Sequence, residues 1–204
     1  MDLASHARVL VRVVLVIVPL CIAGCGTSEP SRFYLLKAAG VDSTEVSSPS
    51  GVRIGLRPFH LPEYLLRYNV VSMLEGNRVD IAEYDRWAEG LDASLSRVMA
   101  DNLSRMVSEA AVYHYPWRRD AGVQLEVSGE VLQFGLDTDG NVRMVVHWTL
   151  GKAGLGEGTD YRFVFARPPS APGIPGTVDM MNQALTALCE AIAGEISQTV
   201  KAPG

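Results

Sequence analysis

The chain has 204 residues, of which 48% are hydrophobic and 20% are charged, and its formal net charge at pH 7 is −5. This composition is typical of a folded globular protein and excludes an intrinsically disordered chain. The acidic balance argues against a nucleic-acid partner and against a broad electrostatic attachment to anionic lipid headgroups.

The first 24 residues have the organisation of a secretory leader. A short basic lead with Arg8 and Arg12 precedes an apolar stretch over residues 13–23. That stretch is too short for a membrane span, which needs about 20 apolar residues. It ends Ile22-Ala23-Gly24-Cys25, which resembles a bacterial lipobox. We therefore predict cleavage before Cys25 and lipidation of its thiol, with an ordinary secretory signal as the alternative.

This leader sets the expected domain organisation and location. Residues 1–24 are a cleaved lipoprotein signal peptide, 25–31 a lipidated tether and 32–204 the folded domain. Three acyl chains, palmitate among them, should anchor the protein permanently, since each buried methylene contributes about 0.8 kcal/mol. Gly26 follows the cysteine, in place of the Asp that resembles an inner-membrane retention signal. We therefore expect the periplasmic face of the outer membrane in a Gram-negative-type envelope.

Cysteine usage excludes an internal disulfide. Cys21 is removed with the leader and Cys25 is lipidated, so that Cys189 remains alone. Cys189 falls at helical spacing with Met181, Leu185 and Ile192, which predicts a buried structural thiol.

The first half of the domain predicts short strands before one long helix. Strands are expected over residues 32–36, 52–56, 70–74 and 78–81, the last two joined by the hairpin residues Glu75-Gly76-Asn77. Pro62 and Glu63 predict a helix of about two turns over residues 61–68. A helix over residues 92–110 is indicated by apolar residues three and four apart, namely Leu95, Val98, Met99, Leu103, Met106 and Val107.

The second half predicts a meander of strands and a final helix. After a strand over 112–115, the apolar residues of 123–127 and 132–136 have opposite parity, which predicts a bulge or bend at Gly129. Further strands are expected over 142–150 and 161–165, with a mobile loop over 151–158 between them. The inward face of the first of these strands is expected to be Val142, Met144, Val146, Trp148 and Leu150. Thr177 is expected to cap a helix that ends near Val200. The fold class is therefore α+β: a single domain with a largely antiparallel sheet of six to seven strands and two long helices packed on one face.

The sequence offers little catalytic chemistry. His60, His114 and His147 have no partner at the spacing of a zinc motif. No serine lies in a GxSxG elbow, and Cys189 has no neighbouring base. The glycines of 151–158 lack the GK[ST] ending of a phosphate loop. We therefore predict no catalytic residue, no metal site and no cofactor, and a protein that is not an enzyme.

Four stretches after the lipobox carry a family resemblance. They are RFYLL at 32–36, RPFHLPEYLLRYNVV at 57–71, YDRWAEGLDASLSRVMADNL at 84–103 and VRMVVHWTL at 142–150. In this order they resemble the PqiC/YmbA-type lipoproteins, the ABC-type transport auxiliary lipoproteins. The most specific pieces are Leu61-Pro62-x-Tyr64-Leu65 and Arg86-Trp87-Ala88-Glu89. Gly90 departs from the stiffer residue expected before the helix.

The resemblance implies an outer-membrane lipoprotein that works with MCE-domain proteins, which form a hydrophobic conduit carrying lipids between the two membranes. This protein would be the auxiliary or docking subunit, contributing to envelope integrity. Docking is expected at or beneath Leu61, Pro62, Tyr64, Leu65 and Trp87. Lipid is a second candidate partner, and homo-oligomeric packing would be natural if the conduit is a symmetric ring.

Other functions stay open from the residues alone. A periplasmic lipid-binding carrier lipoprotein would need an apolar cavity of its own. A structural scaffold would serve another outer-membrane assembly. For Tyr64 and Trp87, a core role and a partner surface are equal alternatives.

Overall fold

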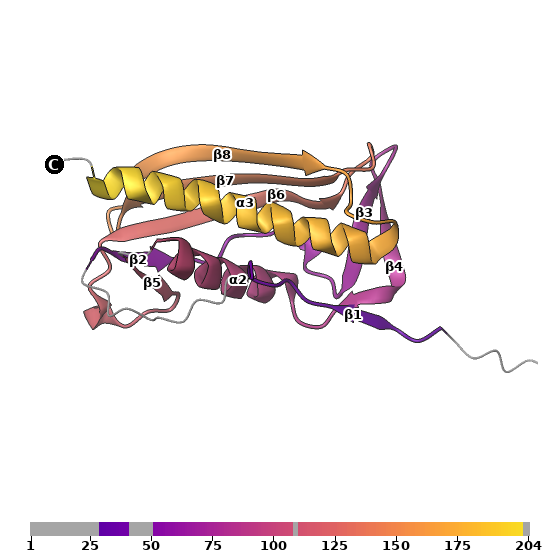
Figure 1. The fold of residues 1–204 in the computed structure, drawn as a ribbon, viewed down its shortest axis with the longest axis horizontal. Coiled ribbons are helices and arrows are strands. Elements are labelled where there is room, and N and C mark those ends of the chain that lie inside the picture. Colours follow the sequence, from indigo (N-terminus) through magenta and orange to yellow (C-terminus); the bar gives the residue numbers. More distant parts are fainter. Residues whose placement is uncertain (1–28, 41–50, 108–109, 202–204) are drawn as a thin grey trace, which may run out of the picture. The chain divides into compact units, whose positions relative to one another are not determined.

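Eight strands in two sheets occur in the computed structural model, which describes residues 29–40, 51–107 and 110–201 (Figure 1). The smaller sheet has the order β1 (Arg32–Tyr34), β4 (Arg78–Trp87) and β3 (Asn69–Leu74). The larger sheet has the order β5 (Ala111–His114), β2 (Arg53–Leu56), β6 (Leu125–Leu136), β7 (Val142–Lys152) and β8 (Gly158–Arg167). Both belong to one compact unit, Ser31–Gly204. The leader, Cys25 and residues 41–50 lie outside the described residues.

Strand pairing follows the length of the connections. The hairpin β3–β4 and the meander β6–β7–β8 are antiparallel. The short strand β2 is parallel to both β5 and β6, and β1 is parallel to β4. Such parallel pairs need long crossovers, and the chain between β2 and β5 supplies one through β3, β4 and a helix. The α+β class is confirmed, and the strands are divided between two mixed sheets.

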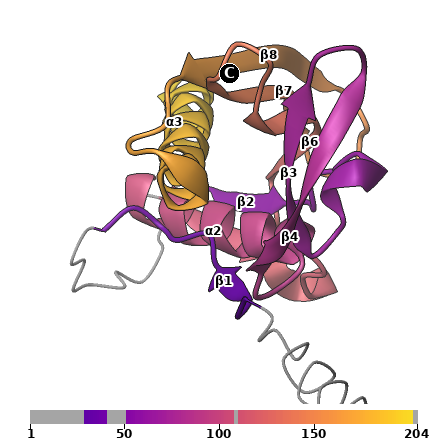
Figure 2. The same ribbon diagram turned by 90° about the vertical axis from the view of Figure 1, so that its right-hand side faces the viewer.

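The described residues form two long helices, α2 (Leu91–Met106) and α3 (Gly173–Lys201). Both helices pack against the strands. Figure 2 shows α3 beside β8, and α2 beneath α3. Helix α3 packs on β6, β7 and β8 as well as on α2. The apolar stripe expected for α2 is buried from Leu95 to Leu103. α3 begins before Thr177, so the expected cap there is wrong: Pro175 is tolerated in a first helical turn, and the Thr177 hydroxyl donates to the Gly173 carbonyl.

The core lies between the helices and the inner side of the large sheet. Strand β7 alternates as expected, and its inward side chains are buried: Val142, Met144, Val146, Trp148 and Leu150. From the helices, Leu95, Met99, Leu185 and Ile192 are fully buried against them. Trp148 stacks on Tyr161 of β8 with ring centroids 4.2 Å apart. Cys189 is buried in this core.

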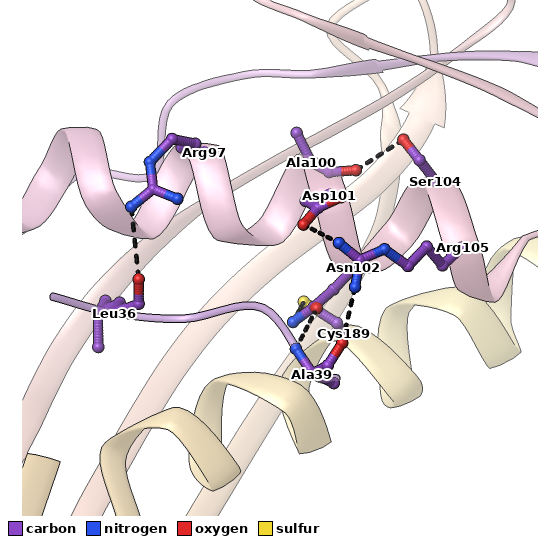
Figure 3. Close-up of polar contacts among 9 residues, drawn as sticks. All are labelled: Leu36, Ala39, Arg97, Ala100, Asp101, Asn102, Ser104, Arg105 and Cys189. Atoms are coloured by element: carbon purple, nitrogen blue, oxygen red, sulfur yellow. Dashed lines mark hydrogen bonds and ion pairs between the residues drawn. The ribbon is translucent and has the colours of Figure 1, made fainter. Parts of the chain in front are cut away.

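An extended segment after β1 crosses both helices (Figure 3). Side-chain amides hold its backbone: Asn182 Oδ1 accepts from the Lys37 N–H at 2.9 Å, and Asn102 Oδ1 accepts from the Ala39 N–H at 2.9 Å. Arg105 Nη1 donates to the Ala39 carbonyl at 2.7 Å. Leu36 is buried beneath the crossing. The start of the domain is therefore fixed to α2 and α3 by specific contacts.

Candidate functional site

The segment after β2 forms one wall of a groove, and β6 fixes its backbone. The Arg57 N–H donates to the Val127 carbonyl at 2.9 Å, and the His60 N–H donates to the Gly129 carbonyl at 3.0 Å. The Val131 N–H in turn donates to the His60 carbonyl at 2.8 Å. Phe59 is therefore directed inward and is 3% exposed.

Gly129 allows this close approach. A Cβ atom at Gly129 would lie 2.5 Å from Phe59 Cε1 and 2.7 Å from the His147 carbonyl oxygen. The bulge expected at Gly129 is wrong in position, because the register of β6 against β7 shifts between Val131 and Gln133. The glycine instead leaves room for a neighbouring ring, which is the other common reason for glycine within a strand.

A single 3₁₀ turn, Glu63–Leu65, continues the wall. The two-turn helix expected over residues 61–68 is wrong, because pairing with β4 draws the chain into β3. The Trp87 N–H donates to the Tyr68 carbonyl at 2.6 Å, so Tyr68 already belongs to the ladder. Leu65 is buried by the turn, whereas Leu66 is 48% exposed.

An open groove of about 750 Å³ lies between this wall and the first half of α2. Its lining is mainly apolar on the wall side and small on the helix side. The lining residues are Pro58, Phe59, His60, Leu61, Leu66, Glu89, Asp92, Ala93, Ser96, Arg97, Ala100 and His114. Ala93, Arg97 and Ala100 recur at helical spacing, so one face of α2 forms the opposite wall.

One ion pair marks the rim of the groove. Arg97 Nη2 bonds to Glu89 Oε1, and this hydrogen bond lowers the pKa of Glu89 below its ordinary value. The same Arg97 nitrogen lies 3.4 Å from the Leu36 carbonyl oxygen (Figure 3). The rim is therefore connected to the segment that follows β1. Both partners are partly exposed, so the pair stabilises the fold only weakly.

The structure separates the five residues expected at the docking surface. Leu61 lines the groove and is partly buried. Pro62 begins the 3₁₀ turn. Tyr64 packs partly buried against the core, and burial raises the pKa of its phenol. Leu65 and Trp87 are 4% and 3% exposed and belong to the core itself. A partner could touch Leu61 directly, whereas Leu65 and Trp87 can act only as support.

Sequence reasoning missed three apolar residues that line the groove. Leu66 directly follows the motif, and its exposure depends on a turn that the sequence predicted as a longer helix. Ala93 and Ala100 lie on the side of α2 away from the apolar stripe that the sequence predicted. A stripe of small residues at spacing 93, 96 and 100 was the available signal.

The described residues offer little reactive chemistry. Among them, no group of three or more His, Cys, Asp or Glu side chains is arranged to hold a metal ion. Burial raises the pKa of the Cys189 thiol to about 12, which keeps it protonated and unreactive. The Asn102 amide donates to its sulfur at 3.9 Å. His147 is exposed on the outer side of β7.

Within the part of the chain that the structure describes, no helix combines the length and apolarity needed to span a membrane.

A comparison with curated proteins finds no match. The crystal structure of an uncharacterized protein superimposes with a TM-score of 0.68 at 23% identity, covering 82% of this chain and 99% of that one. Protein XCC0632 from Xanthomonas campestris gives a TM-score of 0.67 at 13% identity, covering 81% and 94%. These similarities establish the fold.

The family described as ABC-type transport auxiliary lipoprotein component matches residues 34–193. The match includes the 3₁₀ turn, β4 and α2, and thus both walls of the groove. It also agrees with the motifs RPFHLPEYLLRYNVV and YDRWAEGLDASLSRVMADNL, which contain the lining residues of those two walls. The chain therefore belongs to the ABC-type transport auxiliary lipoprotein family.

Proposed function

We propose that this protein is an outer-membrane-anchored periplasmic lipoprotein that docks an MCE-domain protein of an intermembrane lipid transport system and contributes to envelope integrity. Membership in the transport auxiliary family supports the general role. The groove between the Leu61 wall and α2 is the observation that carries the docking surface.

The anchor is proposed from the lipobox. Cys25 follows Ile22-Ala23-Gly24, and its thiol would receive the acyl chains after cleavage. Three chains exceed the two anchoring signals that stable membrane attachment requires. Cys25→Ser should therefore release the protein from the outer membrane fraction. Retention of the Cys25→Ser variant in that fraction would contradict the anchor.

The groove has the properties of a protein-docking surface. Contiguous exposed apolar surface marks interaction sites, and Leu66, which is 48% exposed, lines the groove together with Pro58 and Leu61. Small residues on α2 let a partner segment approach the helix closely. The Glu89–Arg97 pair gives the apolar groove a polar rim, which is the usual anatomy of an interface.

Co-purification from envelopes tests the docking role. The full-length lipidated protein is crosslinked in envelopes and purified, and the captured proteins are identified. We expect an MCE-domain protein with the wild type and its loss with Leu66→Glu. Leu155→Glu is the matched control, because Leu155 is exposed in the turn between β7 and β8, away from the groove. Equal capture by both variants would contradict docking at the groove.

A lipid carrier is the second candidate, because an apolar groove of this volume could also hold an acyl chain. It predicts that lipid is extracted from the purified non-acylated Cys25→Ser protein, and that Leu66→Glu lowers the amount. The docking proposal expects no bound lipid. Capture of an outer-membrane barrel protein in place of an MCE-domain protein would favour a scaffold.

A further inference from the structure

The first strand presents apolar side chains on its outer side. Arg32 Nε donates to Asp85 Oδ1 at 2.8 Å, and the Tyr34 hydroxyl donates to the same oxygen at 2.7 Å. Asp85 is buried, and both side chains lie on the side of β1 that bonds to it, with the Arg32 side chain still 55% exposed. Successive side chains of a strand point to opposite sides. Phe33 is accordingly 64% exposed, and Leu35, which follows the strand, is 43% exposed.

The contacts around β1 fix both exposed side chains in place. Phe33 lies between the two residues that bind Asp85. Leu35 precedes Leu36, which is 1% exposed in the core. The Lys37 N–H is held by Asn182 of α3. Phe33 and Leu35 therefore cannot turn inward without breaking the contacts that begin the domain.

The distance along the chain places this strand close to the acyl chains. Cys25 and Arg32 are seven residues apart, and seven residues span at most about 25 Å in any conformation. This step rests on the anchor proposed above. With Cys25 held in the bilayer, β1 is the described part of the domain that the chain keeps nearest to the membrane surface.

The chemistry of the strand fits a lipid interface. Phe and Leu are among the apolar side chains with which interfacial segments enter the boundary between headgroups and acyl chains. Arg86 of β4 stands in register with Phe33 and is exposed, and a guanidinium is well suited to lipid phosphate. This contact is local, so it agrees with the acidic composition, which disfavours a broad electrostatic attachment.

We propose that Phe33 and Leu35, with Arg86 beside them, contact the lipid headgroup region of the membrane that holds the anchor. The contact orients the domain. In Figure 1 β1 lies at one end of the large sheet, and the turn between β7 and β8 lies at the other end. That turn, with Leu155 65% exposed, then points away from the membrane.

Depth-dependent quenching tests this orientation. The full-length lipidated protein is reconstituted into vesicles of phosphatidylethanolamine with a minor fraction of phosphatidylglycerol. Phe33→Cys and Leu155→Cys are labelled with the fluorophore NBD; the positions have nearly equal exposure. The label is selective, because Cys189 is buried and Cys25 is acylated. We expect a blue shift and quenching by lipids that carry a nitroxide near the headgroup at position 33, and neither at position 155.

The outcomes separate the contact from the anchor. If the protein floats with the vesicles and position 33 is quenched no more than position 155, the contact is wrong while the anchor stands. A blue shift at position 33 without nitroxide quenching would show that a protein, either a second copy or another chain, covers the strand, and it would also overturn the proposal. If the protein does not float, the anchor fails, and the contact fails with it.

Discussion

Strands β7 and β1 distribute their side chains in opposite ways. β7 buries Val146 and Trp148 and exposes His147 between them, so it needs no further covering. β1 instead bonds Arg32 and Tyr34 to Asp85 on one side and exposes Phe33 on the other. The inward side of β7 is covered by α3 of the same chain. The first strand and the groove beside α2 instead leave apolar side chains exposed, Phe33 and Leu66 among them.

The largest expected effect is on the β7 side. Trp148→Ala removes a side chain that is 3% exposed and stacked on Tyr161. Loss of the ring and the resulting cavity should lower the free energy of unfolding by about 3–5 kcal/mol, measured in urea. Leu155→Ala is the control and should change stability by less than about 0.5 kcal/mol. Similar losses of unfolding free energy in the two variants would show that Trp148 stabilises the fold no more than the exposed Leu155 does.

The polar side of β1 should contribute less, and its contribution should depend on pH. The Arg32 hydrogen bond, together with the Tyr34 hydroxyl, holds the pKa of Asp85 below its ordinary value. Asp85→Asn should lower the free energy of unfolding by about 1–3 kcal/mol at neutral pH. A carboxyl group whose pKa is lower in the folded protein than in the unfolded chain contributes its full stabilisation at pH values above the unfolded-state pKa. This contribution to the free energy of unfolding is lost as the pH falls through the folded-state pKa.

The pH dependence gives this prediction a sharp check. The difference in unfolding free energy between the wild type and Asp85→Asn should shrink on acidification below about pH 4, where the carboxyl of the unfolded chain becomes protonated. A difference that stays constant through that range would show that the Asp85 charge does not stabilise β1.

A comparable loss is expected at the wall of the groove. Gly129→Ala places a methyl group where Phe59 Cε1 would lie 2.5 Å away. Overpacking of this kind lowers the free energy of unfolding by about 1–3 kcal/mol. Because the wall must shift, this variant should also weaken capture of the partner, as measured in the envelope co-purification. Unchanged stability would mean that Phe59 does not rest on Gly129.

The smallest effect on stability is expected at the exposed apolar positions. Phe33→Ser and Leu66→Glu should each change the unfolding free energy by less than about 0.5 kcal/mol, because both residues are exposed, Phe33 to 64% and Leu66 to 48%. Their effects should instead be functional: weaker membrane contact for Phe33→Ser and weaker partner capture for Leu66→Glu. A large loss of stability in either variant would identify that residue as part of the core.

Periodic elements were the part of the fold that the sequence could predict. The inward side of β7 and the stripe of α2 follow from spacings of two and of three to four residues. The division into two sheets could not be predicted, because β1 and β2 have three and four residues and carry no pattern. Their parallel partners are distant in sequence, at β4, β5 and β6.

The candidate site was predictable only as a region. The motif around Leu61 indicated the correct wall. Which side chains are buried depends on how β3 and β4 pair, and that pairing shortened the expected helix and buried Leu65. The α2 wall resembled an ordinary solvated helix face in sequence. Only the position of Leu66 opposite Ala93 and Ala100 makes it a groove.

The central claim, that the groove binds an MCE-domain protein, is tested most directly by photo-crosslinking in intact envelopes. A photoreactive amino acid replaces Leu66 in the full-length lipidated protein and, as the control, replaces Leu155. We expect a crosslink to an MCE-domain protein from position 66 and none from position 155. A crosslink from both positions, from neither, or only to lipid would contradict docking at the groove.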